Sequence, residues 1–288
     1  MQAYSHLSYA GNHGDVLKHV VLVNLLEHIK KQSSLKVCYV DTHAGAGIYD
    51  LKGSSTKTRQ AYKTGILPVW EQSEPVEGMQ SYVQLVRARN QDTLLQYYPG
   101  SPLFALSVLA ADDRCYFFEL NSEVFDHLCN TFACYKNVTV IQQDGFSAYA
   151  SVISKDKCQA VFLIDPPYVE SSDYDRVLNL LVQIYSVPSN VTCMIWYPVM
   201  KQACMAKSVA EAVSVGRVLQ LELPVALPDS GTSMIGSGIF IVNPPEGFAE
   251  TMRPVMTALQ KSLSQPRHNL FTIRYLSELS FGYAGNCK

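Results

Sequence analysis

The sequence lacks the features that mark secreted, membrane-spanning or strongly basic proteins. Its 288 residues contain no apolar stretch of the roughly 20 residues that a bilayer-spanning helix needs. The opening residues, Met1 to His6, show no charged region followed by an apolar block, so we expect no signal peptide. Only 17% of the residues are charged, and the net charge of −2 excludes a generally basic nucleic-acid coat protein while leaving room for a local basic patch.

The chain has eight cysteines, but they form no metal-binding pattern. No Cys-x-x-Cys occurs, and no cluster of cysteine and histidine has the spacing of a zinc site. Cys129 and Cys134 are too isolated to suggest a metal site. Four others fall in or beside apolar, strand-like runs, where cysteine acts as a small hydrophobe: Cys38, Cys115, Cys158 and Cys193. We therefore expect a reduced, cytoplasmic protein with no bound metal.

Hydrophobic residues make up 48% of the chain, which is typical of a globular protein with a sizeable core. Apolar runs of strand length alternate with segments of helical spacing, as in an α/β protein with a mostly parallel, doubly wound sheet. We predict strands at residues 36–41, 115–119, 138–142, 160–164, 192–197, 217–224 and 237–242, with a short one at 269–275. We predict helices at residues 14–31, 101–111, 122–133, 173–185, 201–214 and 248–263.

Two regions depart from this alternation. Residues 217–224 and 237–242 are joined without room for a helix, so we predict an antiparallel edge pair. Residues 49–96 start polar and basic and continue into a helix-like segment, and we predict a small helical subdomain there, inserted into one domain made of residues 1–48 and 97–288. This segment contains a basic run made of Lys52, Lys57, Arg59 and Lys63. The run either contacts phosphates, which would make nucleic-acid binding salt-sensitive, or forms a solvated helical face.

The tetrapeptide Asp165-Pro166-Pro167-Tyr168 directly follows the strand predicted at 160–164. In an open α/β sheet, ligands bind just beyond the carboxyl ends of the strands. Asp165 can accept a hydrogen bond from an exocyclic amino group and a proline carbonyl can accept the second hydrogen, while the prolines bring no competing N–H. Tyr168 offers a ring face for stacking. The corner fits methyl transfer to an adenine amino group. The same four residues would also fit a strand that simply ends at prolines, with the aspartate hydrogen-bonded within the protein.

Three further segments fall at predicted strand ends, where one ligand can touch all of them. The glycines of the turn 43–47 let the backbone approach a ligand closely, although the dinucleotide fingerprint Gly-x-Gly-x-x-Gly is absent. Glu119 can accept both hydroxyls of a ribose, and Asp144-Gly145 can read an adenine edge. Each also has an ordinary explanation as a solvated acid or a turn. Their order, one per consecutive strand, favours an S-adenosylmethionine site over a general nucleotide site.

Seven segments between residue 4 and about residue 245 are distinctive in combination: Tyr4-x-His6, Ala10-Gly11-Asn12-His13-x-Asp15-Val16-Leu17-Lys18-His19, Asp41-Thr42-His43-Ala44-Gly45-Ala46-Gly47, Tyr98-Pro99-Gly100-Ser101-Pro102, Asp165-Pro166-Pro167-Tyr168, Trp196-Tyr197-Pro198 and Leu227-Pro228-Asp229-Ser230. Through these segments, the sequence resembles the RlmJ-type 23S ribosomal RNA adenine-N6 methyltransferases. Together, the segments are far more specific than Asp-Pro-Pro-Tyr, which many amino-methyltransferases share. Residues 50–96 and the region after Pro245 depart most from the family pattern.

The resemblance implies a Rossmann-like class I methyltransferase with an inserted helical subdomain and S-adenosyl-L-methionine as its cofactor. It implies that 23S ribosomal RNA, in a protein-free or early assembly form, is the partner, with Tyr4 and Tyr168 near the target adenosine and Asp165 handling the amino protons. It implies cofactor contacts from His19, His43, Ser101, Glu119, Asp144, Gly145 and Asp165. No membrane partner is expected, and the oligomeric state stays open, with a monomer favoured.

The mechanism that we expect is direct transfer, with Asp165 and the Pro166 carbonyl holding the amino group. Fixing such a geometry can supply about 7–11 kcal/mol of the barrier. The alternative enzyme, a DNA adenine-N6 methyltransferase, is disfavoured because the sequence shows no second domain of the size that a DNA target reader needs. A non-catalytic cofactor- or RNA-binding subunit would be expected to lose the aspartate or the aromatic of the motif, and both are intact. A protein-amide methyltransferase would favour asparagine at position 165.

A second Pro-Pro segment, Asn243-Pro244-Pro245-Glu246, follows the strand predicted at 237–242. Asn-Pro-Pro followed by an aromatic residue is itself an amino-methyltransferase motif, but Glu246 cannot stack on a base. We expect this segment to lie at the edge of the sheet, away from the cofactor residues, and we assign it to strand termination.

Overall fold

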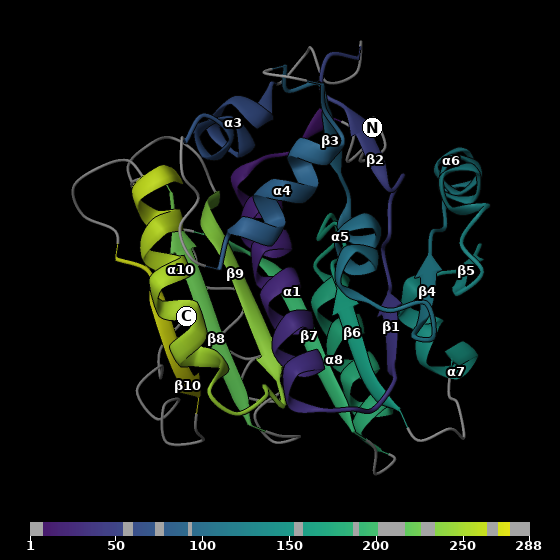
Figure 1. Cartoon of the computed structure of the whole chain (residues 1–288). Helices are drawn as coiled ribbons and strands as arrows, with labels where there is room; N and C mark the ends of the chain where they lie inside the picture. Colours follow the sequence, from purple (N-terminus) through teal and green to yellow (C-terminus); the bar gives the residue numbers. More distant parts are fainter. Residues whose placement is uncertain are drawn as a thin grey trace.

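The computed structural model describes residues 8–53, 60–72, 78–91, 94–152, 158–186, 190–200, 217–225, 234–263 and 270–276. These residues form an eight-stranded sheet in the order β10-β8-β9-β7-β6-β1-β4-β5 (Figure 1). The strands are β1 (Val37–Asp41), β4 (Arg114–Phe118), β5 (Val138–Ile141), β6 (Gln159–Ile164), β7 (Val191–Met200), β8 (Val218–Pro224), β9 (Met234–Val242) and β10 (Thr272–Leu276). Among them, β5, β4, β1, β6 and β7 are parallel neighbours.

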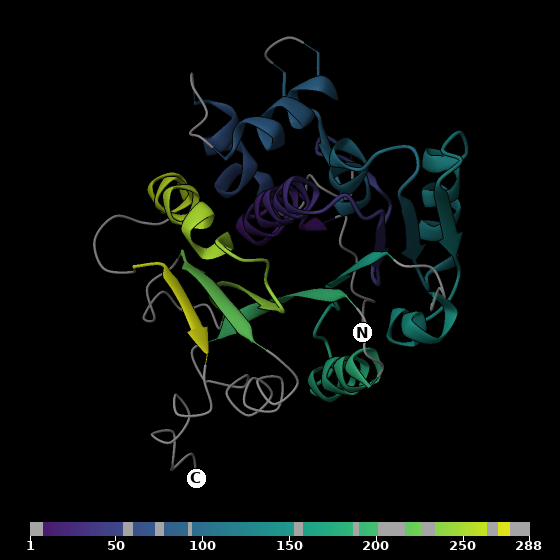
Figure 2. The ribbon, with the colours of Figure 1, turned by 60° about the horizontal axis from the view of Figure 1, so that its bottom comes forward.

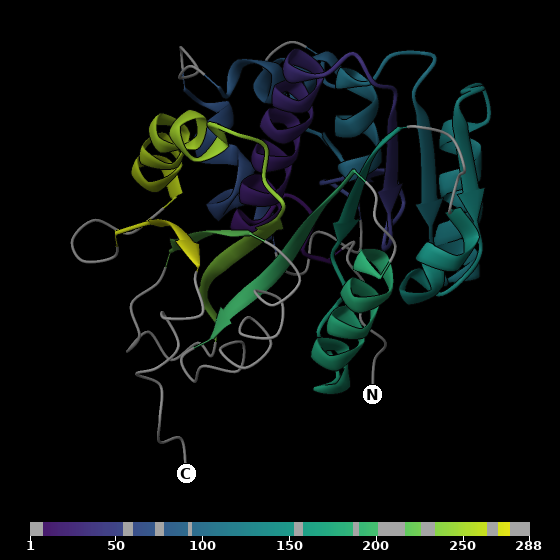
Figure 3. The same cartoon turned by 90° about the horizontal axis from the view of Figure 1, so that it is seen from below.

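Helices cover both faces of the sheet, which makes it doubly wound. One face carries α1 (His13–Gln32), α5 (Ser101–Val108) and α10 (Phe248–Leu263), and the other carries α8 (Ser172–Tyr185), as Figures 2 and 3 show from below. The short α7 (Ala148–Val152) packs with α8, and α6 (Ser122–Phe132) lies beside β5. Two separate apolar clusters result, because alternate side chains of β1 and β6 point to opposite faces. This arrangement is the predicted Rossmann-like α/β fold.

Helix α1 is buried almost all round, as expected of a helix that is apolar on most of its faces. The Asn12 side chain caps it by accepting from the backbone N–H of Asp15, and Lys30 and Lys31 lie in its last turn, where the helix dipole favours positive charge. Within the described residues, no helix combines the length and the apolar character needed to cross a bilayer.

The segment between β1 and α5 carries the helices α3 (Ile66–Trp70) and α4 (Gln80–Ala88), preceded by the 3-10 turn η2 (Ala61–Thr64). Two short strands that the sequence did not reveal, β2 (Ile48–Asp50) and β3 (Tyr97–Pro99), pair antiparallel where the chain leaves and rejoins the main fold. Apolar side chains of α3 and α4 belong to the same cluster as α1. The division into a domain and an inserted subdomain stays a prediction.

The predicted antiparallel pairing of β8 and β9 is confirmed, and the structure adds β10 antiparallel to β8. The expected position of Asn243 at the edge of the sheet is wrong, because β9 lies between β7 and β8. The chain passes from β7 to β8 and then returns through β9 into the space between them, an order that strand patterns along a sequence do not reveal. The helix predicted at 201–214 lies outside the described residues.

Candidate active site

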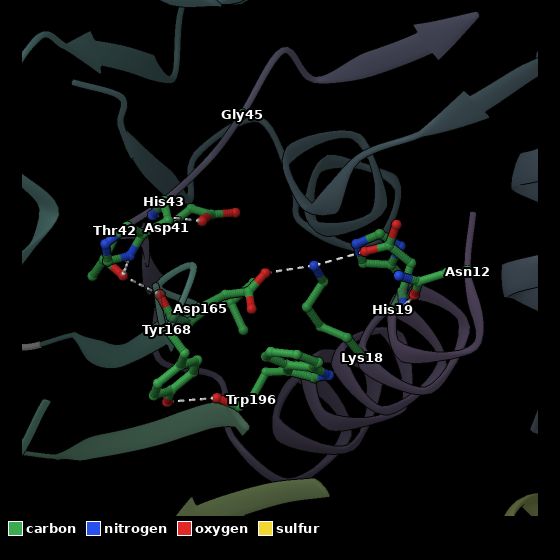
Figure 4. A network of polar contacts seen from close by, with 12 residues as sticks. Asn12, Lys18, His19, Asp41, Thr42, His43, Gly45, Asp165, Tyr168 and Trp196 are labelled. Atoms are coloured by element: carbon green, nitrogen blue, oxygen red, sulfur yellow. Dashed lines mark hydrogen bonds and ion pairs between the residues drawn. The ribbon is translucent and has the colours of Figure 1, made fainter. Parts of the chain in front are cut away.

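Several of the candidate residues, among them His43, Asp165 and Tyr168, lie together at the carboxyl edge of the parallel strands (Figure 4). Strand β1 pairs with β4 on one side and with β6 on the other, so the strand order reverses at this point. Such a switch point is where open α/β sheets bind ligands. Asp41 ends β1, Glu119 follows β4, and Asp165 follows β6.

Asp165 is held by a lysine that the sequence analysis did not select. The Lys18 ammonium lies 2.5 Å from Asp165 Oδ2 and 2.9 Å from Asp15 Oδ1, and the Asp165 side chain keeps 15% of its surface exposed. Burial opposes a charge on Lys18, but the two carboxylates outweigh it and hold the pKa of Lys18 well above its ordinary value. Among the described residues, no donor contacts the other oxygen of Asp165, Oδ1.

The N-terminus of α1 fixes the position of Lys18. Asp15 accepts hydrogen bonds from the Gly11 N–H (2.9 Å) and from Lys18, and its own N–H donates to Asn12 Oδ1 (2.8 Å). Gly11 has φ +76°, a backbone conformation that favours glycine. The segment from residue 10 to residue 19, which the sequence analysis used only for the resemblance, therefore builds one wall of the site.

Asp41 is the second residue that the sequence analysis did not select. It is fully buried, accepts from the Tyr39 hydroxyl at 3.1 Å, and is hydrogen-bonded to Ser101. Burial raises the pKa of Asp41 to about 6, although Ser101 and the charge of Lys18 act in the opposite direction. This contact brings the predicted cofactor residue Ser101, at the start of α5, to the end of β1.

The glycine-rich turn after β1 contacts the predicted ribose-binding acid. Gly45 has φ +63°, and its N–H donates to Glu119 Oε2 at 3.2 Å. The other oxygen, Oε1, accepts from the Asn121 N–H at 2.8 Å. Because each carboxylate oxygen has two lone pairs, Glu119 retains acceptor capacity.

His43 lies in the same turn. Its Nδ1 is 2.7 Å from the Thr42 hydroxyl oxygen, and that hydroxyl donates to the Leu163 carbonyl, so His43 is the donor to Thr42. Burial lowers the pKa of His43 to about 4, despite the nearby carboxylates of Asp165 and Asp144. A neutral imidazole with Nε2 as an acceptor is therefore expected at neutral pH.

Asp144 and Gly145 lie against this turn from the end of β5. A Cβ atom added to Gly145 would lie 1.7 Å from the Thr42 carbonyl oxygen, so only glycine permits this approach. Asp144 accepts from the Phe146 N–H at 3.1 Å and forms an ion pair with Arg176 of α8. The His43 and Phe146 rings meet edge to face, with centroids 5.1 Å apart.

The rest of the Asp-Pro-Pro-Tyr corner is half-buried. Pro166 is buried and Pro167 is exposed. Tyr168 has φ +49°, donates its hydroxyl to the Trp196 carbonyl at 2.8 Å, and packs against Tyr174 with ring centroids 4.7 Å apart. Its phenol is therefore anchored on β7 before any base arrives.

One predicted residue differs from this group in its surroundings. His19 is buried, with Nδ1 2.8 Å from the Tyr98 hydroxyl and its ring stacked on Phe104, between α1 and α5. Tyr4 lies outside the described residues, as do Lys57 and Arg59 of the basic run, whereas Lys52 and Lys63 are exposed.

Three comparisons place the chain among known proteins. A family model described as ribosomal RNA large subunit methyltransferase D, RlmJ, matches residues 34–275. The ribosomal RNA large subunit methyltransferase J of Haemophilus influenzae is 33% identical over 96% of this chain and 99% of its own, and that of Escherichia coli K12 is 33% identical over 91% and 94%. The crystal structure of protein LPL1258 from Legionella pneumophila superposes with a TM-score of 0.81, at 28% identity, over 93% of this chain and 98% of that one. The chain belongs to the RlmJ family of ribosomal RNA large subunit methyltransferases.

Proposed function

We propose that this protein methylates the N6 amino group of an adenine in 23S ribosomal RNA, at the Asp165-Pro166-Pro167-Tyr168 corner. The observation that carries the proposal is the hydrogen bonding of the Asp165 carboxylate. Lys18 binds Oδ2, and among the described residues no donor contacts Oδ1. A carboxylate oxygen left open at the switch point of the sheet is suited to accept a hydrogen from an exocyclic amino group.

The residues at the carboxyl edge fit the cofactor of this family, S-adenosyl-L-methionine. Glu119 and Asp144 are acceptors, suited to ribose hydroxyls and to an adenine amino group. Gly145 packs on Thr42 without room for a Cβ, which joins the ends of β1 and β5 into one surface. When bound, the cofactor would supply an activated methyl group, whose bond to sulfur breaks as the new bond to nitrogen forms. We propose His19, His43, Ser101, Glu119, Asp144, Gly145 and Asp165 as its contacts.

The chain's own groups would then orient the target amine. Asp165 Oδ1 accepts one amino hydrogen and the Pro166 carbonyl accepts the other, which draws the nitrogen lone pair out of conjugation with the ring and toward the methyl group. Lys18 stays charged and fixes the carboxylate through Oδ2, since Asp15 shares its ammonium. Once the new N–C bond has formed, the amine carries one proton too many, and Asp165 is placed to take it. No residue has to become a covalent intermediate.

A methyl-transfer assay tests the substrate class. We would incubate the protein with methyl-labelled S-adenosyl-L-methionine and deproteinised 23S ribosomal RNA, assembled large subunits, or adenine-containing duplex DNA. Label in the deproteinised RNA, with little in assembled subunits and none in DNA, supports the proposal. Label in DNA would favour the DNA methyltransferase, and no transfer to any substrate would favour a non-catalytic subunit.

A further inference from the structure

Arg176 of α8 is the one cation among the described residues that contacts Asp144. It lies eight residues after Tyr168 along the chain, on the helix that follows the Asp-Pro-Pro-Tyr corner. The sequence analysis gave it no role. Its guanidinium forms an ion pair with Asp144 Oδ2, while Asp144 Oδ1 accepts the Phe146 N–H. Both oxygens of Asp144 are therefore oriented by the protein itself.

The same guanidinium makes two further contacts. Its central carbon lies 4.0 Å from the centroid of the Phe146 ring, within the range of a cation–π interaction. It also approaches Asp173, one helical turn earlier on α8, at 3.7 Å. Arg176 thus joins the helix after the catalytic corner to both the acid and the aromatic ring that follow β5.

These contacts are too exposed to be explained by folding stability. The side chains of Arg176 and Asp144 are each 42% exposed, and ion pairs at such positions add little to stability because water and salt screen them. Their geometry, in contrast, is demanding. A planar guanidinium can bind a carboxylate and stack on a ring at the same time, and a lysine ammonium cannot reproduce that combination.

We propose that Arg176 is a positioning residue for the cofactor: it holds Asp144 and Phe146 in the arrangement that selects the 6-amino group of the adenine. This proposal rests on the proposed function, in which Asp144 reads the adenine edge. Arg176 acts only through Asp144 and Phe146. Removing it should therefore weaken binding of ligands that have the amino group, and should leave almost unaffected those that lack it.

The test compares two ligands by isothermal titration calorimetry: S-adenosyl-L-homocysteine and S-inosyl-L-homocysteine, in which a keto group replaces the amino group. The variants of the full chain are Arg176→Gln, Arg176→Lys, Asp144→Asn and the double variant Arg176→Gln/Asp144→Asn. Arg253→Gln, an exposed arginine on α10, serves as the matched control. Arg176→Lys retains the charge, so it keeps the test usable if Arg176→Gln does not fold.

We expect Arg176→Gln to raise the dissociation constant of the adenosyl ligand by about 10-fold, as loss of an oriented charge-assisted hydrogen bond would, and that of the inosyl ligand by less than about threefold. Arg176→Lys should fall between wild type and Arg176→Gln. The double variant should lose less than the product of the single losses, since both changes remove one interaction. At saturating cofactor, the turnover number of Arg176→Gln should stay close to that of wild type.

Three results would overturn the proposal. The first is unchanged adenosyl affinity in Arg176→Gln while Asp144→Asn loses affinity, which would leave Asp144 reading the base without help. The second is an equal loss for both ligands, which would mean that Arg176 supports the pocket in general. The third is tighter binding, which would mean that Arg176 competes with the ligand for Asp144. If Asp144→Asn itself binds both ligands as wild type does, the proposed adenine site fails, and this inference fails with it.

Discussion

Each edge of the central sheet carries a lysine of α1 paired with an aspartate, and a Pro-Pro segment, but the polar groups at the two edges are satisfied differently. At the carboxyl edge, α1 contributes Lys18, which pairs with Asp165 of a Pro-Pro corner. At the amino edge, α1 contributes Lys30, which contacts both carboxylate oxygens of Asp113, at 3.1 and 2.9 Å. A second Pro-Pro corner lies there too, because β9 runs antiparallel to β7 and brings Asn243 next to the start of that strand.

At the amino edge, the chain satisfies its own polar groups. Besides Lys30, Asp113 accepts from the N–H groups of Val37 (2.7 Å) and Ala110 (2.8 Å), and it is fully buried. The backbone N–H of Asn243 donates to the Arg217 carbonyl, and the Asn243 carbonyl accepts from the Thr192 hydroxyl at 3.0 Å.

At the carboxyl edge, the groups pair with one another and leave acceptors open toward the space beyond the strands. Asp165 is held from one oxygen only by the described residues, and burial raises the pKa of the neighbouring Asp41 to about 6. Saturated polar groups are typical of structure, whereas acceptors left open, as on Asp165, and perturbed pKa values, as for Asp41, are typical of function. The difference separates two Pro-Pro corners that look alike in sequence.

The largest expected effect is on catalysis at the Asp-Pro-Pro-Tyr corner of the carboxyl edge. Asp165→Ala should reduce methyl transfer by about 10³-fold or more, because it removes the acceptor of the amino protons. Lys18 keeps Asp15 as a partner, so the variant should fold, and the other proposed cofactor contacts should let it retain some cofactor binding. The matched change at the other corner, Asn243→Ala, should leave the rate essentially unchanged. Similar rates for the two variants, measured in single turnovers, would remove the functional distinction between the edges.

The next effect is on stability at the amino edge. Asp113→Ala should lower the free energy of unfolding by about 3–5 kcal/mol, because it leaves the N–H groups of Val37 and Ala110 without their acceptor and removes the partner of Lys30. The neighbouring Asp112 forms an exposed pair with Lys36 and provides the control. Asp112→Ala should cost at most about 1 kcal/mol. Denaturant titration would show both, and equal losses would mean that burial does not distinguish the two pairs.

A third prediction concerns the pH dependence of stability. The pKa of Asp41 is raised from 3.8 to about 6, so folding favours its protonated form. Its contribution to stability is fully present below pH 3.8 and is lost as the pH rises through 6, a loss on the order of 3 kcal/mol. Asp41→Asn should abolish this contribution.

The variant comparison is needed because two histidines act in the opposite sense. Burial lowers the pKa of His13 and of His43 to about 4, so their contributions are present above pH 6.5 and are lost as the pH falls toward 4. The measured quantity is therefore the difference in unfolding free energy between wild type and Asp41→Asn at each pH. A difference that stays constant between pH 4 and 7 would contradict the raised pKa of Asp41.

The smallest effect is on substrate capture. Tyr168→Ala should raise the RNA concentration for half-maximal rate by about 10-fold, since base stacking on an aromatic ring contributes about 1–3 kcal/mol. Tyr168→Phe keeps the ring and loses only the bond to the Trp196 carbonyl, so it should stay near wild type. An unchanged rate for Tyr168→Ala at low RNA concentration would count against stacking.

Local patterns were enough to predict most of the fold. The parallel strands β1, β4, β5 and β6 are short, largely apolar runs of four to six residues. Helix α1 begins and ends within one residue of its predicted bounds because Asn12 caps it and polar residues follow Gln32. The position of β9 inside the sheet could not be predicted, because the order of strands depends on contacts far apart in the sequence. Strands β2 and β3 have three residues each, which is too short for any periodicity to show.

The same limit applies to the site. Glu119, Asp144 and Asp165 could be selected because each follows a strand, a position visible in the sequence. Lys18 could not, because its partner Asp165 is 147 residues away and nothing in a helical pattern reveals which face meets that residue. Arg176 could not be selected either, because a lone arginine on an amphipathic helix is ordinarily a solvated charge.

The identity of the methylated nucleoside distinguishes transfer to the adenine amino group from transfer to any other atom. RNA methylated by the wild-type protein would be digested to nucleosides and separated, with mass spectrometry to identify the labelled species. We expect N6-methyladenosine, formed by wild type and by Asn243→Ala and absent with Asp165→Ala. A label on a ring carbon or a ribose oxygen, or N6-methyladenosine formed at full rate without the Asp165 carboxylate, would contradict this expectation.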